Sequence, residues 1–183
     1  TQDFDQLYQG AMFMTEQAAG SDVAATLTRA VPHESGVAGT FRLYGDKWFC
    51  SNADAELAMV LARPDRGSGN GADGQGAVPG MKGLSLFLLP RHLDDGRENS
   101  YRIVRLKEKL GTRSMASGEI RLEGAMAYLV GEPGRGFVQM ADMINNSRLS
   151  NGVRAAGLMR GALVPRGESI HHRRSRGARL FYR

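Results

Sequence analysis

The chain has 183 residues, of which 42% are hydrophobic, and a formal net charge of +5. Its length suits one domain. No apolar run approaches the ~20 residues of a membrane-spanning helix, and no signal-peptide pattern is present, so we expect a soluble, cytoplasmic protein. Residues 163–183 hold six arginines and one glutamate, which accounts for the whole +5. The basic charge therefore gives no reason to assign nucleic-acid binding to the body of the protein.

Cys50 is the only cysteine, which excludes an intrachain disulfide and a cysteine-rich metal site. It follows two aromatic residues and has no histidine nearby, so we expect a buried, unreactive thiol. His171 and His172 are adjacent and have no evident partner ligands. No metal site is predicted.

The first third of the chain is predicted to begin with a short polar segment over residues 1–9, which is followed by strands. Apolar and β-branched runs between turn signals predict strands over 10–14, 23–29, 40–44, 48–52 and 57–62. Gly45-Asp46-Lys47 is expected to be a tight turn between two of them. The small residues Ala18-Ala19-Gly20 are expected to form a corner.

Glycine and polar residues between Pro64 and Gly83 predict a mobile loop. Strands are then predicted over 84–89, 103–106, 118–122 and 125–129. Strands and helices do not alternate regularly, which disfavours a parallel doubly wound sheet. The pattern is typical of a mainly β protein, an antiparallel β-barrel or sandwich.

The apolar period changes to that of a helix near Gly136, with Phe137, Met140 and Ile144 on one face. Helical spacing stops at Pro165, and the arginine-rich remainder has no apolar face. We expect this tail to be disordered or non-native.

The stretch from Met12 to Val23 is the strongest candidate for a binding site. Gly20 lets a ligand approach the backbone, and consecutive N–H groups beside the Ser21 hydroxyl could form a concave site for an anion. Small residues between two strands are more often only an ordinary turn. Composition alone does not decide between these two interpretations.

Five stretches, in this order, resemble the acyl-CoA dehydrogenase family. Each stretch alone is a weak motif, but the ordered set is specific. Its residues are most similar to the branch of the alkylation-response flavoprotein. The stretches are Met14-Thr15-Glu16 through Gly20-Ser21-Asp22, Leu43 to Ala53 with the core Lys47-Trp48-Phe49, Gly83 to Phe87, Lys109-Leu110-Gly111-Thr112-Arg113-Ser114, and Leu129 to Phe137.

This resemblance implies a β-barrel middle domain between two helical domains, of which only the barrel and the start of the C-terminal α-helical domain are expected here. The expected boundaries are a residual linker or helix over 1–9, the middle β-barrel domain over 10–135, the first helix of the helical domain over 136–162 and the basic tail over 163–183.

The resemblance also implies contacts to FAD at Met14, Thr15, Gly20, Ser21, Trp48, Phe49 and Ser51. Thr15 matches a residue at the pyrimidine edge of the flavin, and Gly20 and Ser21 match the pair at the pyrophosphate. Phe49 matches an aromatic residue that packs on the isoalloxazine, and Ser51 replaces a threonine near flavin N5. The alternative is structural: Trp48 and Phe49 would fill the barrel core and Ser51 would belong to a turn.

The implied function is α,β-dehydrogenation of an acyl-CoA thioester, with hydride passed to flavin N5. The family's catalytic carboxylate has no counterpart in this chain, so no catalytic residue is assigned and the fragment alone is expected to be inactive. The expected partners are an acyl-CoA substrate, an unidentified electron-transfer partner and further copies of the full-length chain in a dimer or tetramer, with no membrane.

Two other functions remain open from sequence. The first is a DNA-associated flavoprotein of the alkylation-response kind, the only case in which nucleic acid is expected as a partner. The second is a β-barrel interaction module without a cofactor.

Overall fold

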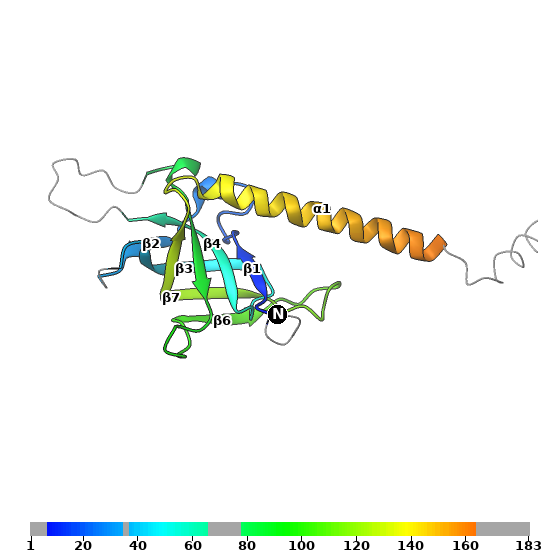
Figure 1. Ribbon diagram of the computed structural model, residues 1–183, viewed down its shortest axis with the longest axis horizontal. Helices are drawn as coiled ribbons and strands as arrows, with labels where there is room; N and C mark the ends of the chain where they lie inside the picture. Colours follow the sequence, from blue (N-terminus) through cyan, green and yellow to red (C-terminus); the bar gives the residue numbers. More distant parts are fainter. Residues whose placement is uncertain (1–6, 35–36, 66–77, 164–183) are drawn as a thin grey trace, which may run out of the picture. The chain divides into compact units, whose positions relative to one another are not determined.

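The computed structural model describes residues 7–34, 37–65 and 78–163 (Figure 1). The tail after residue 163 and the centre of the loop predicted between Pro64 and Gly83 lie outside these ranges. The chain divides into two compact units, Thr1–Ala141 and Asp142–Arg183, and each is described by itself. Among the described residues, no helix combines the length and apolar character needed to span a bilayer.

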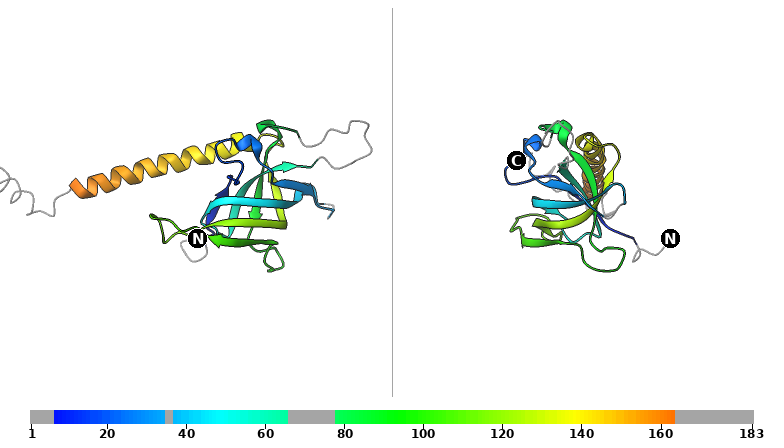
Figure 2. Two further views of the ribbon diagram at one scale, coloured as in Figure 1. Left: turned by 180° about the vertical axis from the view of Figure 1, so that it is seen from behind. Right: turned by 90° about the vertical axis from the view of Figure 1, so that its left-hand side faces the viewer.

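Five strands of the first unit close into a barrel, because each pairs with the next and the last pairs with the first. Around the barrel the order is β4, β2, β3, β7, β5 and back to β4 (Figures 1 and 2). The strands are β2 (Arg29–Pro32), β3 (Thr40–Ser51), β4 (Leu57–Pro64), β5 (Ser85–Pro90) and β7 (Ser117–Val130).

Two further strands lie outside this ring. β1 (Gly10–Phe13) pairs with β4, and β6 (Tyr101–Leu106) pairs with β7. The prediction of a mainly β barrel is confirmed. The structure adds that β1–β4 and β2–β4 are parallel pairs, whereas the other pairs are antiparallel.

The core is formed by side chains that alternate inward along the strands, as expected for a small barrel whose interior is filled. Phe87 on β5 is fully buried and meets Phe41 of β3 edge to face, with ring centroids 5.1 Å apart. Its neighbours in the core include Phe13, Leu43, Val60, Leu89 and Ile120.

The predicted turn at Gly45-Asp46-Lys47 is wrong, because β3 continues through it as one strand. The two strands predicted over 118–129 are likewise one strand, β7. Between Leu43 and Tyr44 the register shifts, and Gly124 of β7, with φ of +86°, is the extra residue. Glycine at this position allows a bulge that bends a long strand around the barrel. In the sequence, a glycine inside a strand resembles a turn signal.

The strand predicted over 23–29 is also wrong. Val23–Ala25 forms the 3₁₀ helix η2, and β2 begins only at Arg29. The Asp22 carboxylate accepts a hydrogen bond from the Ala24 N–H at 3.1 Å. This local cap stabilises the helical turn over an extended conformation.

The helix α1 (Gly136–Leu163) begins at the predicted residue. At its start the Gly136 N–H donates to the Leu84 carbonyl at 2.9 Å, and the Gly134 N–H donates to the Ser85 hydroxyl at 2.9 Å. Met140, one turn later, is fully buried. The first turn of α1 is therefore fixed to β5 of the barrel.

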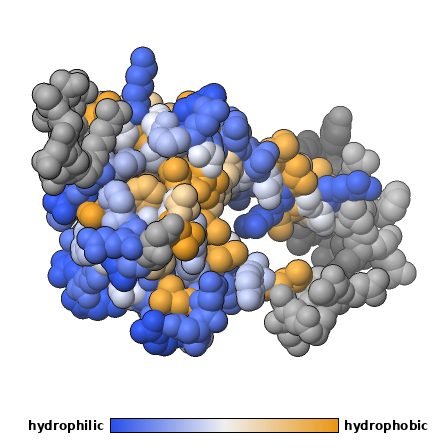
Figure 3. All heavy atoms as spheres, turned by 60° about the vertical axis from the view of Figure 1, so that its left-hand side comes forward, coloured by the Kyte–Doolittle hydropathy of each residue, from blue (hydrophilic) through white to orange (hydrophobic). Residues whose placement is uncertain are grey.

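Apolar side chains are not confined to the interior. Figure 3 shows one face of the molecule, on which apolar groups gather in the middle of the barrel between polar margins. Exposed large apolar residues of the first unit include Leu27, Phe49, Leu106 and Leu110. A contiguous apolar patch on a protein surface is typical of an interaction or ligand site.

Candidate flavin-binding corner

The corner after β1 is held directly against β3. The Trp48 N–H donates to the Thr15 carbonyl at 2.7 Å, and the Lys47 ammonium donates to the Met14 carbonyl at 3.3 Å. Met14 and Thr15 are each half-buried at this contact. The structure thus brings together two motifs that are more than 30 residues apart in sequence.

The corner exposes hydrogen-bond donors. Ala19 is fully buried, and its N–H and carbonyl pair with the carbonyl and N–H of Glu16. Gly20 and Ser21, which follow, are exposed. Within the described ranges, neither their N–H groups nor the Ser21 hydroxyl have a hydrogen-bond partner. These donors are available to an anion.

Gly20 does not use a left-handed conformation, since it is absent from the glycines of positive φ. A Cβ there would meet only Thr15 Cγ2, at 4.0 Å. Glycine at this position leaves the backbone open to approach.

Phe49 is displayed by a bulge. Between Lys47 and Cys50 the register shifts, so Trp48 and Phe49 together oppose Glu119 of β7. Phe49 has φ of 55°, an uncommon conformation for a bulky residue, and the residue is 62% exposed. Outliers of this kind cluster at functional sites. The alternative that Phe49 fills the barrel core is therefore wrong.

Lys107 lies over both aromatic rings. Its ammonium is 3.2 Å from the centroid of Trp48 and 4.7 Å from that of Phe49, which is the range of cation–π attraction. The Glu119 carboxylate accepts hydrogen bonds from Lys107 at 2.5 Å and from Arg105 at 2.6 Å. These contacts fix the orientation of the Trp48 ring.

Ser51 is exposed at the end of β3, as a ligand contact requires. Its hydroxyl oxygen lies 3.5 Å from that of Ser117, which accepts a hydrogen bond from Lys109 at 2.8 Å. Lys109 begins the fourth family motif and lines a cavity of about 290 Å³ with Arg113. Ser51 therefore lies beside this motif.

Sequence reasoning missed the ion pair between Lys47 and Glu16, whose charged groups are 2.8 Å apart with side chains 0% and 7% exposed. Burial by itself would raise the pKa of Glu16, but the Lys47 ammonium and hydrogen bonds from Thr28 and Leu27 outweigh it and lower the pKa. Lys47 was assigned to a turn, where a charge is normally solvated. Glu16 and Lys47 both lie in stretches that resemble the acyl-CoA dehydrogenase family, which is the only sequence signal of the pair.

Cys50 is buried, and burial raises the pKa of its thiol to about 12 against the opposing effect of Lys47 and Lys107. The prediction of a buried thiol is confirmed, and the raised pKa disfavours the reactive thiolate. Among the residues described, no cluster of histidine, cysteine and carboxylate side chains could hold a metal.

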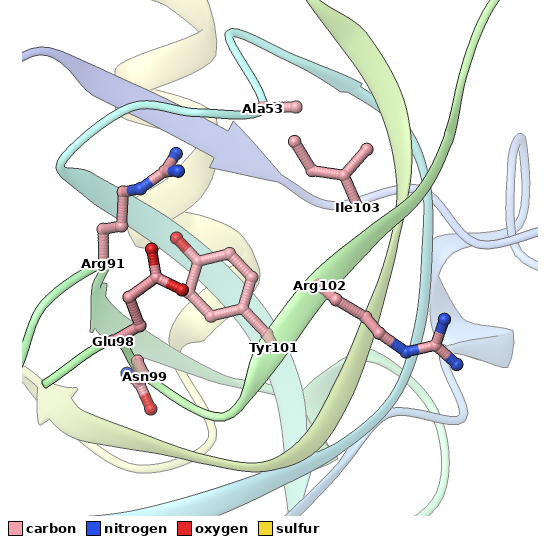
Figure 4. Close-up of a pocket in the computed structure, with 7 residues that line it drawn as sticks. All are labelled: Ala53, Arg91, Glu98, Asn99, Tyr101, Arg102 and Ile103. Atoms are coloured by element: carbon pink, nitrogen blue, oxygen red, sulfur yellow. The ribbon is translucent and has the colours of Figure 1, made fainter.

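A second cavity, of about 230 Å³, lies beside β6 (Figure 4). Arg91 and Glu98 face the Tyr101 ring there, while Arg102 points away from it. The Tyr101 hydroxyl is buried without a hydrogen-bond partner in the described part of the chain, and burial raises its pKa. None of the predicted cofactor contacts lines this cavity, so it is separate from the corner.

Comparisons with known proteins match this chain to one family. Residues 11–125 match the family described as the acyl-CoA dehydrogenase middle domain. The curated relative acyl-CoA dehydrogenase family member 11 of Caenorhabditis elegans is 40% identical over 161 residues, which cover 87% of this chain and 25% of the relative. The Escherichia coli (strain K12) protein AidB is 36% identical over 151 residues, 82% of this chain and 24% of that protein.

The fold comparison includes the crystal structure of Caenorhabditis elegans ACDH-11 in complex with C11-CoA. It has a TM-score of 0.73 and 39% identity, over 85% of this chain and 25% of that one. The chain thus spans about a quarter of the length of these relatives, and the AidB-like, alkylation-response branch is among them. The motif order, the barrel and the matched residues lead to one conclusion: the chain belongs to the acyl-CoA dehydrogenase family.

Proposed function

We propose that this chain is the middle domain of an FAD-dependent acyl-CoA dehydrogenase-like oxidoreductase. The proposed domains are the barrel over residues 10–135 and the first helix of a helical domain over 136–162. The observation that carries the proposal is the pairing of the Thr15 carbonyl with the Trp48 N–H, which joins the corner with its unpaired donors to the strand that displays the exposed Phe49 ring.

The chemistry of these residues fits FAD. An anionic pyrophosphate is stabilised by N–H and hydroxyl donors such as those of Gly20 and Ser21. The exposed ring of Phe49 offers a flat apolar surface to the isoalloxazine, and the neutral hydroxyls of Thr15 and Ser51 can donate to flavin heteroatoms. FAD bound in this way would supply the hydride acceptor.

The residues of this chain would act on the cofactor by orientation and water exclusion. Neutral donors near the pyrimidine edge stabilise negative charge that develops there, and an aromatic wall keeps water out. No carboxylate of the described residues is assigned to proton abstraction. The proposed base belongs to parts of the family that this chain does not span.

The substrate and assembly are proposed from the same relationship. A relative was crystallised with C11-CoA, so an acyl-CoA thioester is the proposed substrate class. The full-length protein is proposed to be a homodimer or homotetramer that passes electrons to a separate carrier. A DNA-associated role is less favoured, because the net charge of residues 1–162 is zero.

Ser21→Ala is expected to weaken FAD binding about tenfold, since a hydrogen bond to a charged group contributes roughly 1.5 kcal/mol or more. The measurement is a titration of the full-length gene product, freed of flavin, with FAD. Ser100→Ala is the matched control, because Ser100 is exposed and remote from the corner in sequence. Equal FAD affinity in the Ser21 variant and the parent would contradict the assignment of Ser21.

A further inference from the structure

Lys47 is the one fully buried lysine among the described residues, and FAD contact does not explain it. Its ammonium bonds the Glu16 carboxylate at 2.8 Å and the Met14 carbonyl at 3.3 Å. Burying a charge is costly unless it is paired and hydrogen-bonded. Both conditions are met here.

The Glu16 carboxylate is bound from a third segment as well. It accepts hydrogen bonds from the Leu27 N–H at 2.7 Å, the Thr28 N–H at 3.1 Å and the Thr28 hydroxyl at 2.6 Å. Thr28 also packs under β3, because a Cβ at Gly45 would lie 2.9 Å from its Cα. One carboxylate thus joins the corner, the segment before β2 and strand β3.

The position of this pair in the chain relates it to the proposed site. Glu16 directly follows Thr15, and Lys47 directly precedes Trp48. The Lys47–Glu16 bond therefore lies beside the Trp48–Thr15 backbone bond of 2.7 Å. Two adjacent bonds, one charged and one of the backbone, fix the corner in register with the strand that displays Phe49.

Stability alone does not require charges at these positions. A buried ion pair can often be replaced by apolar residues of similar size without loss of stability, whereas its directional bonds define one arrangement of the segments. Six hydrogen bonds hold the corner, the segment before β2 and strand β3 together. Five of them involve the side chains of Lys47 or Glu16, and the sixth is the backbone bond of Trp48.

We propose that Lys47 and Glu16 are positioning residues for FAD: their buried ion pair holds the donors of Thr15, Gly20 and Ser21 at a fixed place relative to the Phe49 ring. This inference rests on the proposed function. It assigns to the pair no contact with FAD.

The test separates positioning from stability. The double variant Glu16→Met/Lys47→Met removes both charges and keeps their volume, and Asp46→Asn/Arg121→Gln is the control, an exposed pair between β3 and β7 with its closest atoms 2.7 Å apart. We expect the double variant to unfold cooperatively at a lower Tm than the parent, because the Leu27 and Thr28 donors lose their acceptor. Under conditions in which both proteins are folded, it is expected to bind FAD at least about tenfold more weakly in the full-length gene product.

A second measurement needs no FAD. Trp48 is the only tryptophan of the 183-residue chain, so its fluorescence emission reports on the corner. The double variant is expected to shift this emission. An unchanged emission spectrum together with an unchanged FAD affinity in this variant would overturn the proposal. The control pair is expected to leave both unchanged.

If the double variant does not fold, Thr28→Val decides. It removes the 2.6 Å bond to Glu16 and keeps both charges. FAD affinity is then expected to fall about threefold, in line with the loss of one hydrogen bond, and parental affinity would overturn the proposal. A parent protein that binds no FAD would refute the proposed function instead, and the emission of Trp48 would still test the pair.

Discussion

Lys47→Met alone is expected to lower the free energy of unfolding by about 3–5 kcal/mol, because it leaves the buried Glu16 carboxylate without its cation. Urea denaturation of the 183-residue chain at neutral pH measures this loss. Adding Glu16→Met to the same variant is expected to recover only part of it, because the unpaired charge is removed but the Leu27 and Thr28 donors lose their acceptor. A single variant as stable as the parent would contradict the buried pair.

The same variant has a predictable dependence on pH. In the parent, the pKa of Glu16 is lowered below its ordinary value of 4.5. The stability that the ionised Glu16 carboxylate contributes to the folded state is therefore fully present above pH 4.5 and is lost as the pH falls through the lowered pKa. Without Lys47, burial instead favours the protonated carboxyl. The stability gap between parent and Lys47→Met should therefore narrow as the pH falls below 4.5. A gap that widens in acid would contradict this account.

Gly136→Ala is expected to destabilise the first unit by about 3 kcal/mol or more, the upper range of overpacking. A Cβ at Gly136 would contact the Ser85 backbone and lie 2.6 Å from the Leu86 nitrogen, where neither atom can move without disturbing β5. The bond from the Gly136 N–H to Leu84 would be strained as well. Thermal unfolding followed by near-UV circular dichroism measures the effect.

Gly152→Ala is the matched control on the same helix. A Cβ at Gly152 meets nothing within 4 Å, so the substitution is expected to stabilise α1 by about 0.5–1 kcal/mol through helix propensity. Opposite signs at the two glycines would show that the contact at Ser85 outweighs propensity. Stabilisation by both substitutions would contradict the described start of α1.

The barrel and the helix could be predicted because their signals are local. Apolar alternation marks a strand such as β5, and the change of period near Gly136 marks α1. Long strands were divided in the prediction, because Gly45 and Gly124 resemble turn residues when the strand opposite is unknown. Asp22 caps a helical turn inside a segment whose composition favours a strand.

The candidate site was predictable only in part. Residues alone left an anion-binding corner at Gly20 and Ser21 open beside an ordinary turn, and the family resemblance favoured the binding site and added the aromatic residues. The bulge that exposes Phe49 depends on the register with Glu119, and the Lys47–Glu16 pair joins residues 31 positions apart. Contacts of this kind arise from tertiary packing and leave no pattern in the local sequence.

Anaerobic addition of a saturated acyl-CoA to the FAD-reconstituted full-length gene product is the most direct test of the proposed function. We expect the product to retain FAD and the visible absorbance of the oxidised flavin to be lost as the thioester is dehydrogenated. A product that retains no FAD after reconstitution, or whose flavin keeps its absorbance with acyl-CoA thioesters of every chain length, would contradict the proposed function.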